Sequence, residues 1–177
     1  MEIRPATVAD APSIARTHAT VWRRTYRELA PPEAIAALDE ASRRARWVEL
    51  LSHPAPGQAA LVAGIDGRLA GFGLAGPAVH PAFGGRAEIR YLYVDDAFQR
   101  RGVGRRLMAE LAAGLAATGR KAVALGVVEG NAPAIAFYAA MGGRAVGTYT
   151  DPGPIWRSSN IVYAWDDITV LCGRGAA

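Results

Sequence analysis

The sequence predicts a single α/β domain whose central mixed, mostly antiparallel sheet is flanked by helices. Its 177 residues match one domain, since domains cluster near about 100 to 150 residues. Residues 87–128 follow the order strand, turn, helix, strand, which is typical of α/β proteins. The Asp66-Gly67 pair between two apolar runs favours a tight antiparallel hairpin. We expect the domain to span residues 1–172 and residues 173–177 to form a frayed tail.

The first third of the chain is expected to form a short edge strand followed by helices. The strand EIRPAT ends at Pro5, and Asp10 precedes the first long helix. Residues 31–51 predict one or two shorter helices, with prolines in the first turn and Ser42 as an N-cap. The apolar and aromatic residues that recur at helical spacing in the first long helix are Ile14, His18, Val21, Trp22 and Tyr26.

The middle of the chain predicts three strands. Residues 59–66 and 68–79 form the two arms of the hairpin at Asp66-Gly67. Residues 87–96 follow a loop and contain AEIRYLYV, in which β-branched and aromatic residues crowd together. This strand leads directly into a glycine-rich, basic turn.

The last third is expected to alternate helices and strands. The helix that begins at Val103 presents one apolar face and ends near Gly119, and the strand KAVALGVV after it is apolar enough to be buried. Asn131 opens a short helix, and the glycines at 142 and 143 stop it. Two final strands are expected over 143–149 and 159–171.

Composition and charge exclude several classes of protein. With 51% hydrophobic and 20% charged residues, the chain is expected to be globular and soluble. Its apolar runs, such as residues 122–128, fall far short of the about 20 residues that span a bilayer, so we expect no membrane contact. No secretion signal opens the chain, which predicts the cytoplasm. The only cysteine, Cys172, and the three histidines lie in no metal-ligand spacing, so no metal is expected.

The stretch QRRGVGRRL between a strand and a helix is suited to binding an anion. The first N–H groups of a helix lack backbone partners and lie at the positive end of the helix dipole. Gly102 and Gly104 allow close approach of an anion, and arginines surround them. An ordinary tight turn with a solvated basic face would explain the same residues equally well. The spacing matches neither a Walker loop nor a dinucleotide fingerprint.

A second motif separates these alternatives. Q-x-x-G-x-G at Gln99, Gly102 and Gly104 is followed by N-x-x-A-x-x-F-Y, which begins at Asn131 and ends at Tyr138. Together with the order of elements along nearly the whole chain, this pair of motifs resembles the GNAT superfamily of N-acetyltransferases. The resemblance implies a single GNAT-type domain that uses acetyl-coenzyme A (acetyl-CoA) as acetyl donor. The cofactor-binding residues that it implies are Leu92, Tyr93, Val94, Gln99, Arg100, Arg101, Gly102, Val103, Gly104, Arg105 and Asn131.

The resemblance also implies where the chemistry takes place. The strand carrying Tyr91 to Val94 is expected to diverge from the strand carrying Leu125 to Val127, and the thioester would enter the gap between them. Tyr138 matches the tyrosine that faces the sulfur and would act as general acid, although a core aromatic is the alternative. Glu88 resembles the glutamate that some members use as base, directly or through water. The alternative is that Glu88 pairs with an arginine such as Arg90 or faces solvent.

The acceptor cleft is expected beside the first long helix. His18, Trp22 and Tyr26 share one face of this helix. We expect Trp22 and Tyr26 to contact the acceptor, with core packing as the alternative, and His18 to be a buried hydrogen-bonding residue. Trp156 and Tyr163 could line the same cleft or form a subunit contact, so a homodimer remains open.

The predicted activity is transfer of an acetyl group to an amine by direct attack through a tetrahedral intermediate. The acceptor is expected to be a small-molecule amine or a peptide N terminus. A non-catalytic sensor or assembly module that binds acyl-coenzyme A is the alternative. A nucleic-acid binder that uses RRAR at 43–46 ranks last, because acidic residues are interspersed with the basic ones, so we expect no nucleic-acid partner.

Overall fold

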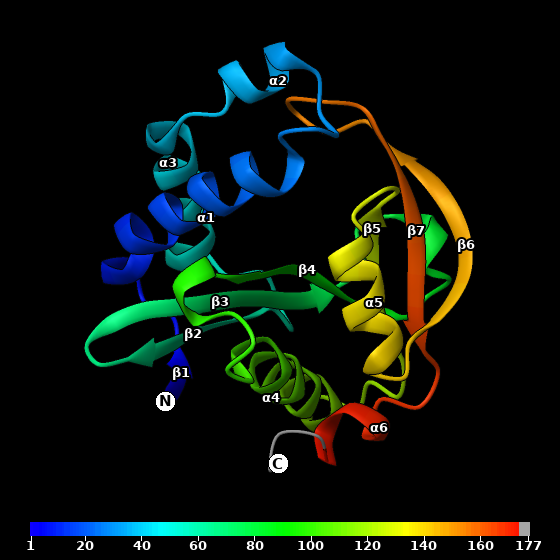
Figure 1. Cartoon of the computed structure of the whole chain (residues 1–177). Coiled ribbons are helices and arrows are strands. Elements are labelled where there is room, and N and C mark those ends of the chain that lie inside the picture. Colours follow the sequence, from blue (N-terminus) through cyan, green and yellow to red (C-terminus); the bar gives the residue numbers. More distant parts are fainter. Residues whose placement is uncertain (174–177) are drawn as a thin grey trace.

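The computed structural model describes residues 1–173, and within them seven strands form one sheet (Figure 1). Of the predicted tail, residues 174–177 lie outside the described part. The strand order is β1-β2-β3-β4-β5-β7-β6, and every neighbouring pair is antiparallel except β4 and β5. This confirms the mixed, mostly antiparallel sheet. The strands are β1 (Glu2–Pro5), β2 (Ala59–Ile65), β3 (Arg68–Pro77), β4 (Ala87–Val94), β5 (Val123–Val128), β6 (Arg144–Asp151) and β7 (Ser158–Trp165).

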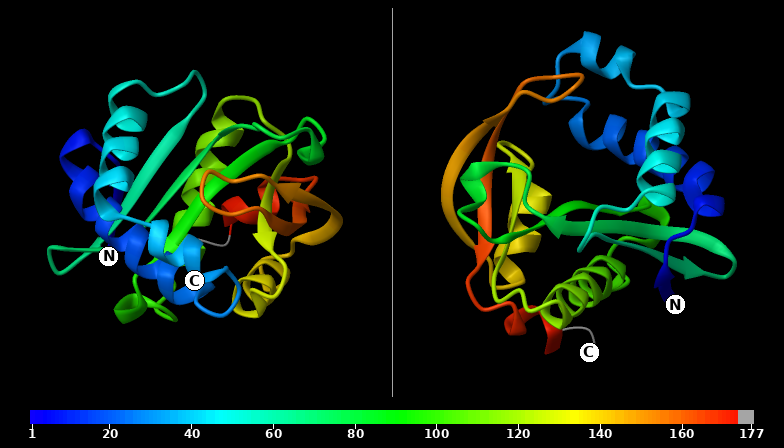
Figure 2. Two further views of the ribbon diagram at one scale, coloured as in Figure 1. Left: turned by 90° about the horizontal axis from the view of Figure 1, so that it is seen from above. Right: turned by 180° about the vertical axis from the view of Figure 1, so that it is seen from behind.

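Helices cover both faces of the sheet (Figures 1 and 2). The N-terminal helices lie over one face of β3 and β4, and the long helix before β5 crosses the other face. A short helix after β5 lies beside that strand. The helices are α1 (Ala11–Tyr26), α2 (Pro32–Ala37), α3 (Glu40–Ser52), α4 (Val103–Ala117), α5 (Ala132–Ala140) and α6 (Thr169–Cys172).

Two differences from the prediction go beyond a shift of a residue or two at an element's end, and at each an aspartate carboxylate accepts a hydrogen bond from the first turn of the next helix. Residues 31–51 form α2 and α3 with a break at Leu38, and the N-cap of α3 is Asp39 rather than Ser42. The Asp39 carboxylate accepts a hydrogen bond from the Ser42 N–H at 2.9 Å, so the predicted cap lies inside the first turn. The last strand ends at Trp165 rather than near residue 171, because the Asp167 carboxylate accepts from the Thr169 N–H as α6 begins.

The strands β4 and β5 pair over only two positions and then diverge. Ala87 faces Val123 and Glu88 faces Ala124, after which β4 stays paired with β3 and β5 with β7. In Figure 1 the two halves of the sheet point in different directions beyond this point. The backbone of β4 from Ile89 onward therefore has no strand partner on its β5 side within the described residues. The predicted divergence is confirmed.

Close packing of α4 against β3 sets the position of the turn before α4. A Cβ atom on Gly73 would lie 2.6 Å from a Leu111 methyl carbon, and one on Gly71 would lie 3.2 Å from a Leu107 methyl carbon. Glycine at these two positions lets the helix approach the sheet closely. Leu107 and Leu111 are fully buried in this contact. The N-terminus of α4 is thus held beside the end of β4.

Asp10 anchors the start of α1, and its ionisation should make the free energy of unfolding depend on pH in the acid range. Arg4 Nη2 donates to Asp10 Oδ1 at 2.7 Å, and the Thr7 N–H donates to Oδ2 at 2.8 Å. These hydrogen bonds, chiefly the one from Arg4, lower the pKa of Asp10 to about 2. A carboxyl whose folded pKa is depressed stabilises the fold above its unfolded pKa, and this contribution is lost as pH falls through about 2.

We therefore expect Asp10→Asn to lower the free energy of unfolding at pH 7 by about 1 kcal/mol, a value discounted because Arg4 is half-exposed. The deficit should shrink by about half at pH 3. Urea denaturation at pH 7, 5 and 3 measures it, with the exposed Glu110→Gln as control. A deficit that stays constant across this range would contradict the assignment.

Candidate active site

Two cavities open on either side of the point where β4 and β5 diverge. The turn cleft, about 740 Å³ in volume, lies between the end of β4, the start of α4 and α5. The aromatic cleft, about 470 Å³, lies between α1, α3, β4 and the loop joining β6 to β7. The two clefts adjoin, because five residues line both of them as a shared wall. The residues of this shared wall are Tyr26, Ile89, Arg90, Tyr93 and Gly126.

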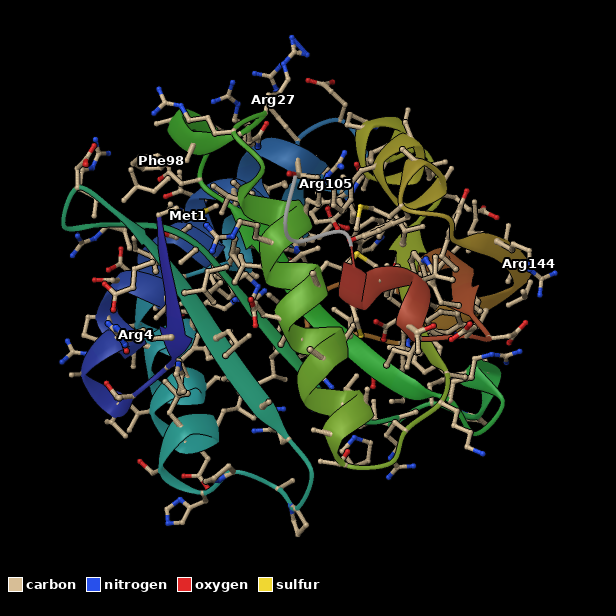
Figure 3. The ribbon with its side chains drawn as sticks, turned by 90° about the horizontal axis from the view of Figure 1, so that it is seen from below. Met1, Arg4, Arg27, Phe98, Arg105 and Arg144 are labelled. Atoms are coloured by element: carbon tan, nitrogen blue, oxygen red, sulfur yellow. The ribbon has the colours of Figure 1, made fainter. Side chains whose placement is uncertain are left out.

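The basic turn lies at the rim of the turn cleft. Gly102 adopts a φ of +79° as N-cap of α4, and no side chain caps the first turn of this helix. Arg100 is also in the left-handed region, with a φ of +60°. The N–H groups at this helix start, together with the side chains of Arg100 and Arg105 that line the same cleft, could hold an anion. Figure 3 shows Phe98 just before the turn and Arg105 in the first part of α4.

All the residues expected to bind the cofactor line the turn cleft except Arg101. The Arg101 guanidinium instead lies 5.8 Å from the centre of the Phe98 ring, where it makes a cation–π contact. The two neighbours of Arg101, Arg100 and Gly102, both have their backbone in the left-handed region. Arg101 therefore has a contact of its own outside the cleft.

Tyr138 lies on α5 and lines the turn cleft. Its ring centre is 5.4 Å from that of Phe137 and 6.1 Å from that of Tyr163. Burial raises the pKa of the Tyr138 phenol above its usual value, and the nearby Tyr26 raises it further. The phenol therefore keeps its proton through neutral and mildly alkaline pH and can act as a donor. Tyr26 belongs to the shared wall, which places Tyr138 near the junction of the two clefts.

Glu88 is buried at the base of the aromatic cleft. The Val79 N–H donates to Glu88 Oε2 at 3.1 Å, and Arg90 Nη2 lies 3.4 Å from the same oxygen. Arg90 Nη2 also donates to the Pro77 carbonyl at 3.2 Å, and its Nε is buried without a partner among the described residues. Glu88 thus pairs with Arg90 and does not face bulk solvent. A long ion pair at a cleft wall is compatible with a further role for the carboxylate.

Three aromatic rings form the far wall of the aromatic cleft. Trp22 and Tyr26 on α1 have ring centres 5.0 Å apart. Trp156, on the loop between β6 and β7, lies 6.4 Å from Trp22 and 5.9 Å from Tyr26. Trp22, Tyr26 and Trp156 therefore line the cleft together. Tyr163 does not line it, because its side chain is buried in the core beside Tyr138.

His18 is the buried hydrogen-bonding residue that the sequence predicts. Its Nδ1 accepts a hydrogen bond from Trp47 Nε1 at 3.1 Å, and only 1% of the residue is exposed. Burial, followed by the charge of Arg43, lowers the pKa of His18 to about 3. The imidazole is therefore neutral at physiological pH, with its proton on Nε2.

The sequence reasoning missed several residues of the aromatic cleft. The sequence suggests a role for Arg43 only in a nucleic-acid patch, yet in the structure its side chain lines the cleft. Its position four residues before the buried Trp47 on α3 was a usable signal, because residues at this spacing share a helix face. Tyr149 gave no such signal. It lies on β6, and its hydroxyl packs so closely over Gly126 of β5 that a Cβ there would overlap it.

Comparison with solved structures defines the class of protein. The chain superposes on ribosomal-protein-alanine N-acetyltransferase from Brucella melitensis with a TM-score of 0.71 and 26% identity, over 93% of this chain and 99% of that one. PaiA N-acetyltransferase from Thermoplasma acidophilum, solved with coenzyme A, gives a TM-score of 0.70 at 19% identity, over 92% and 96% of the two chains. The fold is that of the N-acetyltransferases.

The sequence gives the family. Residues 21–142 match the acetyltransferase (GNAT) family. Over 170 residues, 96% of this chain and 95% of the relative, it is 29% identical to the uncharacterized N-acetyltransferase YuaI of Bacillus subtilis strain 168. The chain belongs to the GNAT acetyltransferase family and is an acetyl-CoA-dependent acyltransferase.

Residues 1–173 lack two further features. No helix there has the length and apolar character that crossing a membrane requires. No group of three or more histidine, cysteine, aspartate or glutamate side chains in this part of the chain could hold a metal ion.

Proposed function

We propose that the protein transfers an acetyl group from acetyl-CoA directly to a primary amine. The observation that carries this proposal is the junction of the two clefts. Their shared wall lies where β4 and β5 diverge, with Tyr138 on the side of the turn cleft and Glu88 on the side of the aromatic cleft. A donor bound in one cleft and an acceptor in the other would meet there without a covalent enzyme intermediate.

The turn cleft fits the donor. Free N–H groups of the first turn of α4, together with Arg100 and Arg105, suit a pyrophosphate. Backbone groups of Leu92 and Val94, on the edge of β4 that lacks a strand partner, suit the amides of a pantetheine arm. An N–H on this edge can also polarise the thioester carbonyl and stabilise the negative oxygen of a tetrahedral intermediate.

The chemical step needs one base and one acid. The amine nitrogen attacks the thioester carbon, the N–C bond forms, and Glu88 accepts the amine proton directly or through water. As the C–S bond breaks, the Tyr138 phenol donates toward the departing sulfur. A thiol has a lower pKa than a phenol, so this donation is a hydrogen bond that strengthens as charge develops on the sulfur.

The role of Glu88 predicts a pH-dependent defect. An alkyl amine with a pKa near about 10.4 is almost entirely protonated at pH 7, so a base is needed most at neutral pH. We expect Glu88→Gln to lower kcat by at least about 100-fold at pH 7 and by much less near pH 10, where the amine deprotonates unaided. Initial rates of thiol release across this range measure it, with Glu110→Gln on the exposed face of α4 as control. An equal loss at every pH would assign Glu88 a structural role.

The proposed function is tested by binding and turnover together. Titration calorimetry should show that acetyl-CoA binds the wild-type chain, and a screen of amines should release free thiol. Failure of acetyl-CoA to bind would contradict the proposal. Tight binding without turnover of any amine would favour the non-catalytic acyl-coenzyme A module instead.

A further inference from the structure

The aromatic cleft contains a cation that no acidic side chain within residues 1–173 neutralises. The Arg43 side chain, half-buried on α3, lines this cleft, and within residues 1–173 its guanidinium makes no ion pair or hydrogen bond. Its charge acts on two groups of the cleft, lowering the pKa of His18 and opposing the rise in the pKa of Tyr93. The other cation of the cleft, Arg90, is already held by Glu88 and a carbonyl oxygen.

His18 adds a second donor next to Arg43. Its Nδ1 is occupied by Trp47, so the proton of the neutral ring is on Nε2. That N–H has no partner among the described residues, although the side chain is 99% buried. It is not sealed from solvent either, since the buried unpartnered atoms of the described residues do not include it. Because His18 and Arg43 both line the aromatic cleft and the charge of Arg43 acts on His18, we take this N–H to be available to the same bound group as the guanidinium.

The acidic groups lie on the opposite side of the same cleft. Burial raises the pKa of Tyr149, whose hydroxyl lies over Gly126, and the charges of Asp151 at the end of β6 and Glu88 on β4 raise it further. Gly126 belongs to the wall shared with the turn cleft. Neither acid pairs with Arg43. The cleft is thus polarised, with donors for an anion near α1 and α3 and acceptors for an ammonium near the junction.

We propose that the acceptor is an amino carboxylate, whose carboxylate is held by Arg43 and the His18 N–H while its amine points to the junction of the clefts. This inference rests on the proposed function and deepens it. A charge-assisted contact with a guanidinium in a partly buried cleft is strong and specific. The Trp22, Tyr26 and Trp156 wall would hold the carbon skeleton between the two charged ends. A cleft of about 470 Å³ suits a free small molecule.

The test compares acceptors that differ only in the carboxylate. Leucine is paired with isopentylamine, and 6-aminohexanoate with pentylamine, so that two spacings of amine and carboxylate are sampled. Calorimetric binding, with and without coenzyme A, and thiol release with acetyl-CoA are measured for each pair. We expect at least one amino carboxylate to bind at least about tenfold more tightly than its partner amine and to be acetylated with a correspondingly higher kcat/KM.

Variants assign the preference to Arg43. Arg43→Met keeps the length of the side chain and removes its charge, and Arg44→Met makes the same change at the exposed next residue, which does not line the cleft. We expect Arg43→Met to lower binding and kcat/KM for the amino carboxylate by about 10- to 100-fold. The partner amine should change less than about threefold with Arg43→Met. Arg44→Met should leave both ligands unchanged.

The outcomes separate the two proposals. If acetyl-CoA binds but neither amino carboxylate binds better than its partner amine, the amino-carboxylate proposal is overturned and the proposed function stands. An equal loss for both members of a pair in Arg43→Met overturns it too. If acetyl-CoA does not bind, the proposed function fails, while calorimetry on the free protein still shows whether the carboxylate site exists.

Discussion

Replacing Tyr138 with phenylalanine is expected to lower turnover by about 10²- to 10⁴-fold, the usual range for a positioned acid or base. Phenylalanine keeps the ring, which packs against Phe137, Tyr163 and Trp165, and removes only the hydroxyl. The variant should therefore keep its fold, and its affinity for acetyl-CoA should change less than a few-fold. Because burial keeps the wild-type phenol protonated, its removal takes away a donor and not a charge.

Three measurements on this variant distinguish the roles of Tyr138. Thermal melting, calorimetric binding of acetyl-CoA and the rate of thiol release are compared with those of Tyr163→Phe, which alters a neighbouring buried tyrosine that lines neither cleft. Near-normal turnover in Tyr138→Phe would show that the thiolate leaves without its help. Joint loss of binding and turnover would make Tyr138 a binding or packing residue.

Replacing Gly104 with glutamate is expected to reduce the affinity for acetyl-CoA by at least about 100-fold, since a like charge placed within about 4 Å of a phosphate costs several kcal/mol in a partly buried site. A Cβ at Gly104 would lie 3.5 Å from Phe137 and from Val94, which is ordinary contact, so the backbone accepts a side chain. The carboxylate would then extend into the turn cleft, where Gly104 is part of the lining.

The same substitution should not destabilise the fold. An acidic side chain in the first turn of a helix interacts favourably with the helix dipole, so thermal stability should be unchanged or slightly higher. The matched control is Gly114→Glu, in the same helix at a position where a Cβ meets no other atom within 4 Å. That control should bind acetyl-CoA normally. Unchanged affinity in a folded Gly104→Glu variant would place the pyrophosphate elsewhere.

Local signals explain what the sequence predicted correctly. The hairpin at Asp66-Gly67, the helix that follows the basic turn and the helix opened by Asn131 all depend on neighbours within a few residues. The Asn131 side chain, for example, accepts from the Ala134 N–H, as expected of an N-cap. The errors were also local. Asp39 and Ser42 are both good caps, and only the extended backbone at Leu38 decides between them.

The composition of the aromatic cleft depends on contacts between distant segments. Arg43 lies in the cleft because Trp47 is buried beside His18, 29 residues earlier in the chain, and this contact orients the face of α3. The Tyr149 side chain on β6 reaches across β7 to Gly126 on β5, a contact that depends on the order of these strands in the sheet. Neither relation leaves a periodic pattern, so the sequence suggested only a nucleic-acid patch at residues 43–46 and a strand over 143–149.

The sequence by itself determined the order of the elements, the basic glycine turn before α4 and the two motifs that mark the family, because capping, turn chemistry and hydrophobic periodicity act over a few residues. Only the tertiary structure decided at which residue, directly after Glu88, β4 and β5 separate, that Arg101 lies on Phe98 outside the cleft and that Arg43 has no counterion within residues 1–173. Packing across the whole sheet selects these arrangements, since each depends on which distant side chains fill the space around it.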